Sequence, residues 1–171
     1  MSWFSKALGI IALLVLLILG MTGSGFGAPG PSLVIQADTV LGPKNLKQDE
    51  IAAKTCVAWS RFARNEQIVW RIRVFDPATG RPMDEKPMEA VSVLLADGTI
   101  LKTRYGPHPA RDATDHFWTT SWVIPSNYPT GTLRYKITAR TIDGRLGEFM
   151  PFNVASSLVT IVDAVRPATG Q

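Results

Sequence analysis

Residues 133–140 read LRYKITAR, and this stretch decides the fold. Leu133, Tyr135, Ile137 and Ala139 alternate with charged or polar residues, so an extended strand would have one apolar face and one cationic face. A period of two is typical of a half-buried strand in an antiparallel sheet. The stretch therefore predicts a strand whose apolar face packs on a core.

The same period recurs on both sides of this stretch. Residues 68–74, IVWRIRV, place Ile68, Trp70, Ile72 and Val74 on one face, with Arg71 and Arg73 on the other. Turn signals, including Asp-Gly at 97–98 and 143–144, separate further strand-like segments. Those segments span residues 91–95, 100–105, 117–124, 149–154 and 157–162. We therefore expect an all-β chain, an antiparallel sandwich of seven to eight strands.

The region before residue 55 has a different character. Residues 28–31, APGP, predict a linker, residues 32–36 a short lead-in strand, and residues 45–55 one or two turns of helix. The predicted domains are thus a linker and lead-in segment at 29–54, the sandwich at 55–163 and a disordered tail at 164–171.

The turn and strand residues from Ile68 to Val154 resemble the immunoglobulin-like and fibronectin-III-like domains of bacterial exported proteins. The likeness is carried by WRIRVFDPATGRPM at 70–83, EAVSVLLADGT at 89–99, WVIPSNYPTGTLRYKITARTIDGRLGEF at 122–149 and FNV at 152–154. It implies an immunoglobulin-like scaffold and no activity. The chain departs from antibody domains because it lacks their paired cysteines.

The N-terminal residues 1–28 predict export. Lys6 supplies a basic start, residues 7–21 are an unbroken apolar run, and no charge occurs between residues 7 and 28. This stretch fits a signal peptide, or an N-terminal hydrophobic helix kept as a single-pass anchor that contacts the membrane through residues 7–28. In both cases the rest of the chain is extracytoplasmic, in the periplasm or at the cell surface.

Composition excludes several function classes. The net charge is +4, or +3 without Lys6, and the arginines are scattered, so we expect no nucleic-acid partner. Cys56 is the single cysteine, which rules out an internal disulfide and predicts a buried thiol; an intermolecular disulfide and a metal-ligating thiolate are the alternatives. No G-x-S-x-G motif accompanies the two histidines, so we expect a protein that is not an enzyme.

The segment YGPHPARDATDHFW at 105–118 suggests a metal site. It brings His108, His116 and Asp115 within a few residues, and these ligand types suit copper or zinc. Met83, Met88 and Cys56 are candidates to add sulfur. The alternative is a solvated loop with two ordinary histidines and no cofactor.

Aromatic residues supply a second candidate surface. Trp118 and Trp122 share one face of the strand predicted at 117–124. If that face is exposed, Trp118, Trp122 and Tyr105 form a surface for a partner. Trp59, Trp70, Tyr128 and Phe117 admit the same interpretation, with core packing as the alternative.

We therefore expect a non-catalytic extracytoplasmic binding or accessory module that docks on a partner protein or membrane complex of the envelope. The alternative function is a periplasmic protein that binds copper or zinc through the loop of His108 and His116.

Overall fold

The structure is a computed structural model that describes residues 32–54, 57–108 and 113–164. Its strands are β1 (Val34–Leu41), β2 (Arg61–Ala63), β3 (Gln67–Asp76), β4 (Arg81–Pro82), β5 (Met88–Leu95), β6 (Ile100–Lys102), β7 (Arg104–His108), β8 (Asp115–Val123), β9 (Gly131–Leu133), β10 (Tyr135–Thr141), β11 (Leu146–Phe149) and β12 (Val159–Val162). The helices are α2 (Gln48–Lys54) and the single 3₁₀ turn η1 (Ala155–Ser157).

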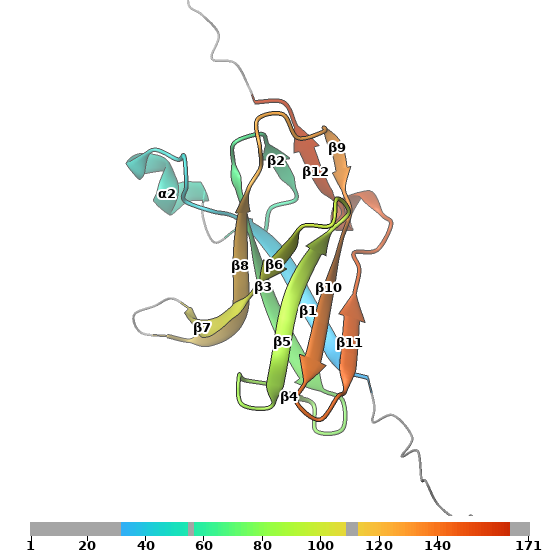
Figure 1. The fold of residues 1–171 in the computed structure, drawn as a ribbon. Coiled ribbons are helices and arrows are strands. Elements are labelled where there is room, and N and C mark those ends of the chain that lie inside the picture. The colour runs from blue at the N-terminus through green and yellow to red at the C-terminus, as the bar shows by residue number, and fades with distance from the viewer. Residues whose placement is uncertain (1–31, 55–56, 109–112, 165–171) are drawn as a thin grey trace, which may run out of the picture. The chain divides into compact units, whose positions relative to one another are not determined.

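The described chain is mostly β, and almost all its strands pair antiparallel (Figure 1). The first sheet has the order β1-β3-β8-β7, with β4 added to β3, and the second has the order β11-β10-β5-β6. A small third sheet, β2-β12-β9, contains the parallel pair β12–β2. The prediction of an all-β chain built from antiparallel sheets is confirmed.

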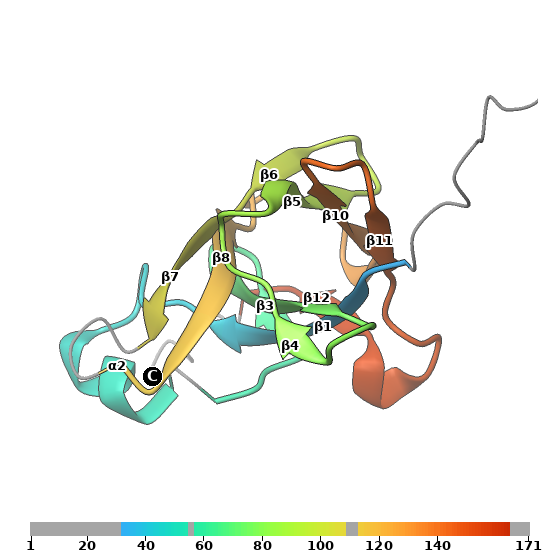
Figure 2. The ribbon, with the colours of Figure 1, turned by 90° about the horizontal axis from the view of Figure 1, so that it is seen from below.

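The first two sheets face each other, as the view along the strands shows (Figure 2). The buried apolar side chains between them form one hydrophobic core. Side chains of β3 line it from one sheet and those of β5 and β10 from the other. The largest fully buried side chains of these strands are Trp70, Ile68, Ile72, Leu95, Ile137, Val74 and Val93. The alternation read from residues 68–74 and 133–140 therefore identified the inward faces.

Several boundaries differ from the prediction. Strand β1 pairs with β3 over all eight of its residues, so the segment expected as a lead-in is a strand of the first sheet. The described residues contain twelve strands, more than the seven or eight expected, because short pieces of two to four residues are set off by turns. The strand expected at 149–154 ends at Phe149, since the chain leaves the sheet before Pro151.

Three predictions fall on residues outside those described. They are the hydrophobic helix, signal peptide or anchor at 1–28, the burial of Cys56, and the tail beyond Ala164. None of the helices in the described ranges is long and apolar enough to cross a membrane.

The two main sheets touch at one edge, where the start of β1 meets β11. The Leu33 N–H donates to the Leu146 C=O at 2.9 Å. Gly147 permits this approach, because a Cβ at that position would lie 2.8 Å from the Leu33 Cβ and 2.9 Å from the Leu33 oxygen. A residue without a side chain is therefore required where the two backbones come closest.

We expect Gly147→Ala to destabilise the fold by about 1–3 kcal/mol, because the added methyl group overlaps the Cβ and backbone of Leu33, just before β1. Gly106→Ala is the matched control: it also lies in a strand, and its added Cβ would meet nothing within 4 Å, so its effect should stay within about 0.5 kcal/mol. Urea unfolding midpoints measure both. Equal midpoints for the two variants would contradict the close approach.

Candidate functional site

The β7–β8 hairpin places the two histidines on opposite faces of the sheet. In the register of this pair His108 lies across from Asp115, and His116 lies across from Pro107. Residues that face each other across a ladder share a face, and successive residues alternate. His108 and Asp115 are therefore together, while His116 is on the other side.

Each of these side chains already has neighbours. His108 lies edge-on to the Phe117 ring at 5.8 Å between ring centroids, and His116 stacks on Tyr105 at 5.7 Å. Asp115 forms an ion pair with Arg73. The hairpin thus separates the two imidazoles and engages the carboxylate with a guanidinium.

The sulfur ligands considered from the sequence do not join this group. Met83 and Met88 are both buried in the hydrophobic core, and Cys56 lies outside the described residues. Within the described ranges, no three His, Cys, Asp or Glu side chains gather closely enough to hold a metal ion. The geometry therefore does not favour the metal function.

The aromatic surface expected on β8 faces inward. Trp118 is only 7% exposed and its Nε1–H donates to the Met83 C=O at 3.2 Å. Trp122 packs edge-on against Tyr128, and Tyr105 packs against Trp118 with ring centroids 5.2 Å apart. Trp118 therefore packs in the core, which was the alternative interpretation of this residue, because β8 turns this face inward. The partner surface of Trp118, Trp122 and Tyr105 stays a prediction.

A different groove, of about 410 Å³, lies where the edges of the two main sheets diverge beyond their contact at Leu33 and Leu146. Strand β1 forms one wall, and the chain between β11 and β12 forms the other. The segment before β2 closes one end of this edge groove. Its lining is Ala37, Asp38, Thr39, Ala58, Trp59, Ser60, Tyr135, Phe149, Pro151, Phe152, Ser157 and Val159.

Backbone hydrogen bonds hold Trp59 at the groove. The Trp59 N–H donates to the Thr39 C=O at 2.7 Å, and the Thr39 hydroxyl donates to the Trp59 C=O at 2.5 Å. On the following residue, the Ser60 C=O accepts from the Thr160 N–H at 2.7 Å. Trp59 is thus fixed between β1 and β12, yet its side chain is 46% exposed.

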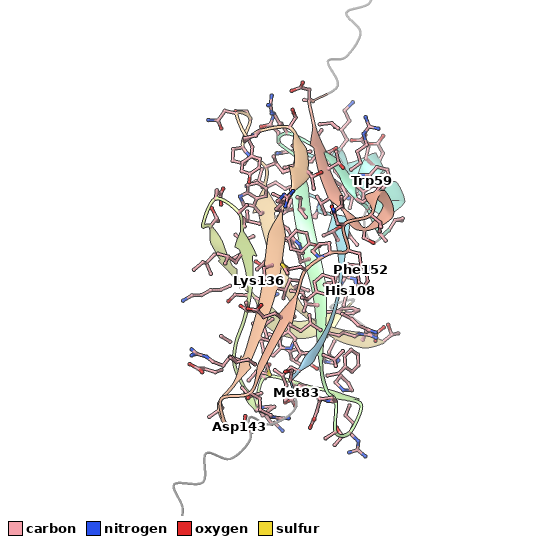
Figure 3. All side chains as sticks on the ribbon, turned by 90° about the vertical axis from the view of Figure 1, so that its right-hand side faces the viewer. Trp59, Met83, His108, Lys136, Asp143 and Phe152 are labelled. Atoms are coloured by element: carbon pink, nitrogen blue, oxygen red, sulfur yellow. The ribbon has the colours of Figure 1, made fainter. Side chains whose placement is uncertain are left out.

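Phe152 lies on the wall formed by the chain between β11 and β12 and is the most exposed large apolar side chain of the described residues, at 78%. Figure 3 looks onto this side of the molecule and labels both Trp59 and Phe152. Of the nine exposed large apolar side chains in the described ranges, five belong to the two segments that border the groove: Val57, Trp59, Met150, Phe152 and Val154. Such clustering of apolar surface is typical of an interaction site.

Tyr135 forms part of the groove floor and joins it to the core. Its ring meets Trp70 edge-on, with centroids 5.6 Å apart. Burial raises the pKa of the Tyr135 phenol to about 12, and the nearby Trp70 indole N–H opposes this shift in part. That N–H is buried and reaches no partner in hydrogen-bonding geometry among the described residues. The floor is therefore apolar apart from a neutral phenol.

The outer side of β1 is polar. Arg71 donates two hydrogen bonds to Asp38, at 2.8 and 2.6 Å. The guanidinium carbons of Arg71 and Arg73 lie 5.7 and 4.7 Å from the centre of the Phe117 ring. A shallow depression of about 320 Å³ lies over these residues and shares Ala37 and Asp38 with the edge groove. Strand β1 therefore separates an apolar groove from a charge-paired surface.

Sequence reasoning named Trp59 only as one aromatic residue among several and did not name Phe152. The alternation over 149–154 predicted a strand there, although Pro151 argues against a continuous ladder. The signal that could have found the site is the series Met150, Phe152 and Val154 around that proline. A sequence does not show, however, that this series lies beside Trp59.

We expect His108 and His116 not to share a metal ion, because the sheet separates them. Isothermal titration of the double variant His108→Ala with His116→Ala should give the same Zn²⁺ and Cu²⁺ binding as the unchanged protein. A site tighter than micromolar that is lost in the double variant but kept in Met83→Leu would contradict this geometry.

We expect the neutral Tyr135 phenol to stabilise the fold only below strongly alkaline pH. Its folded pKa of about 12 exceeds the ordinary value of 10.0, so the stabilisation is fully present below about pH 10 and is lost as the pH rises toward 12. The full loss, reached above about pH 12, should be about 3 kcal/mol, and about 2 kcal/mol of it should fall between about pH 9 and about pH 11.5. Unfolding at these two pH values measures that part.

Tyr135→Phe should lose much less stability between these two pH values than the unchanged protein does. Tyr128→Phe is the control, because Tyr128 is less buried and its own pKa is raised less. Parallel pH profiles for the unchanged protein and Tyr135→Phe would show that the phenol is solvated.

No family model matches the chain, and no curated protein matches it. Among solved structures, the chain is similar to the crystal structure of a DUF4426 family protein from Pseudomonas aeruginosa PAO1. The sequence identity is 13%, the TM-score is 0.36, and the similarity covers 70% of this chain and 84% of the other. A similarity this low implies neither a family nor a ligand.

Proposed function

We propose that this protein is a non-catalytic binding module of the cell envelope, and that the edge groove receives an apolar part of a partner protein or membrane complex. The observation that carries this proposal is the pair Trp59 and Phe152, two exposed aromatic side chains that line the same groove. Aromatic side chains that are exposed in the free protein and become buried in a complex dominate binding energies.

The polar groups of the groove support binding better than catalysis. They are the hydroxyls of Thr39, Ser60, Ser157 and Tyr135 and the carboxylate of Asp38. Asp38 is occupied by Arg71, and no His, Lys or Cys is among the described residues that line the groove. A hydroxyl without a neighbouring base is a weak nucleophile, so these groups are suited to orient a partner.

The sequence supports the proposed cellular location of the module and its proposed scaffold. The apolar residues 7–21 and the uncharged stretch up to residue 28 favour export or anchoring, and with it an extracytoplasmic location. The turn and strand residues from Ile68 to Val154 favour an immunoglobulin-like sandwich. Scaffolds of this kind present binding surfaces at their edges and loops, where this groove lies.

We expect a photoreactive benzoylphenylalanine at position 152 to crosslink the full chain to a discrete envelope protein in the host cell. The same group at position 100 is the matched control, since Ile100 is 64% exposed but lies on β6, at the far edge of the second sheet from β11. The purified crosslinked protein should then bind the module, with affinity measured by calorimetry.

Phe152→Ala should weaken that affinity by roughly 30-fold, because burial of one phenylalanine contributes about 2 kcal/mol. Ile100→Ala should change it by less than about twofold. The proposal is wrong if position 152 gives no product beyond that of position 100, or if Phe152→Ala binds the crosslinked protein as tightly as the unchanged module.

A further inference from the structure

The outer edge of β1 presents its odd-numbered residues. The backbone groups of the even residues point toward β3, as the hydrogen bond from the Gly42 N–H to the Gln67 C=O shows just beyond the strand. Odd residues point the other way: the Leu33 N–H bonds to Leu146 and the Thr39 C=O accepts from Trp59. The N–H and C=O groups of Ile35 and Ala37 therefore face outward as well.

This edge is closed at both ends and unpaired between them. Leu146 covers it at Leu33, and the segment of Ala58 and Trp59 covers it at Thr39 and Val40. Among the described residues no strand pairs with the outer edge of β1 between these points. The span from Leu33 to Thr39 is about 20 Å long, because a strand rises about 3.3 Å per residue.

Ala37 itself lines the edge groove, so its outward N–H and C=O lie at the wall of the cavity that holds Trp59 and Phe152. An unpaired strand edge is a template for another extended segment. The two sides of this edge differ: most of the residues that line the groove are apolar, among them Trp59 and Phe152, whereas the other side carries the Asp38–Arg71 ion pair. A segment added here would meet apolar and polar surroundings at alternate residues.

We propose that the partner enters the edge groove as a short extended segment, which adds to β1 by backbone hydrogen bonds with Ala37 and Ile35. Its apolar side chains enter the groove between Trp59 and Phe152, and its polar side chains lie over the Asp38–Arg71 ion pair. This inference rests on the proposed function and specifies the class of ligand: a peptide segment with alternating apolar and polar residues.

The unpaired span suits an extended peptide better than a second copy of this chain. The contacts of Leu33 with Leu146 and of Thr39 with Trp59 leave only Ile35 and Ala37 between them to pair. A second copy would bring its own exposed Trp59 and Phe152 to the same groove, beside those of the first copy. A single extended peptide carries no such neighbouring segments.

The test uses Ala37→Pro in the full chain, with Ala37→Ser as the matched control. Proline removes the outward N–H and is tolerated on an edge strand whose N–H faces away from the sheet, whereas serine keeps the N–H at a similar size. Circular dichroism and thermal unfolding establish that both variants fold. Ala37→Pro should weaken peptide binding at least tenfold, and Ala37→Ser should change it less than twofold.

The probe is the acetylated and amidated peptide Lys-Val-Thr-Val-Thr-Val-Lys, which the basic chain does not attract by charge. Two versions carry N-methyl groups at alternate amides, one set at the valines and the other at the threonines. Strand addition needs the amides of only one set, so one version should lose binding and the other should keep it. Binding through apolar contact alone would treat the two versions equally.

Amide hydrogen exchange gives an independent readout. The amides of Ile35 and Ala37 should exchange at least tenfold more slowly when the peptide, or the partner crosslinked at position 152, is bound. If neither ligand protects these amides, or if both N-methylated versions bind alike, strand addition is wrong. In that case a Phe152-dependent affinity for the crosslinked partner still supports the proposed function, so the two failures are distinguishable.

Discussion

The architecture depends on strand β3, which runs through the middle of the first sheet and supplies its inward face. Ile68, Trp70, Ile72 and Val74 are wholly buried along this one strand. Its neighbours β1, β8 and β4 all pair with it, and its tryptophan meets Tyr135 of the opposite sheet edge-on. Burial of four large apolar side chains on one strand is worth several kcal/mol, comparable to the net stability of a domain.

The edge groove is a consequence of how the two sheets meet. They touch where Gly147 allows Leu33, just before β1, to approach β11, and the chain leaves β11 after Phe149 and continues to η1. Among the described residues, part of the β1 edge is left without a strand neighbour, and Trp59 and Phe152 line the groove beside it. A protein that has no use for such an edge covers it or places a charge on it. Here the gap is lined with aromatic side chains, which is why we interpret it as a binding site.

Local pattern predicted the strands and their inward faces well, because alternation requires only neighbouring residues. Tyr135, Ile137 and Ala139 are buried as their spacing predicted, and Trp70 lies in the same core. Local pattern did not decide whether Trp118 is buried or exposed, and the structure buries it. The two faces of β8 are both rich in apolar and small polar residues, so the sequence could not decide which face would pack on the core.

The metal hypothesis gained no support for a related reason. His108 and His116 are close in sequence, but closeness in sequence does not determine on which face of a hairpin each side chain lies.

The sequence by itself determined that the chain is built from antiparallel strands, where its main inward faces lie and that its first residues are apolar, since these are properties of adjacent residues. The tertiary structure alone decided that β1 belongs to the sheet, that its edge is uncovered at Ile35 and Ala37, and that Trp59 and Phe152 face one groove. Those facts depend on which distant segments pair, and pairing is set by the packing of the whole core and by the close approach of Gly147 to Leu33.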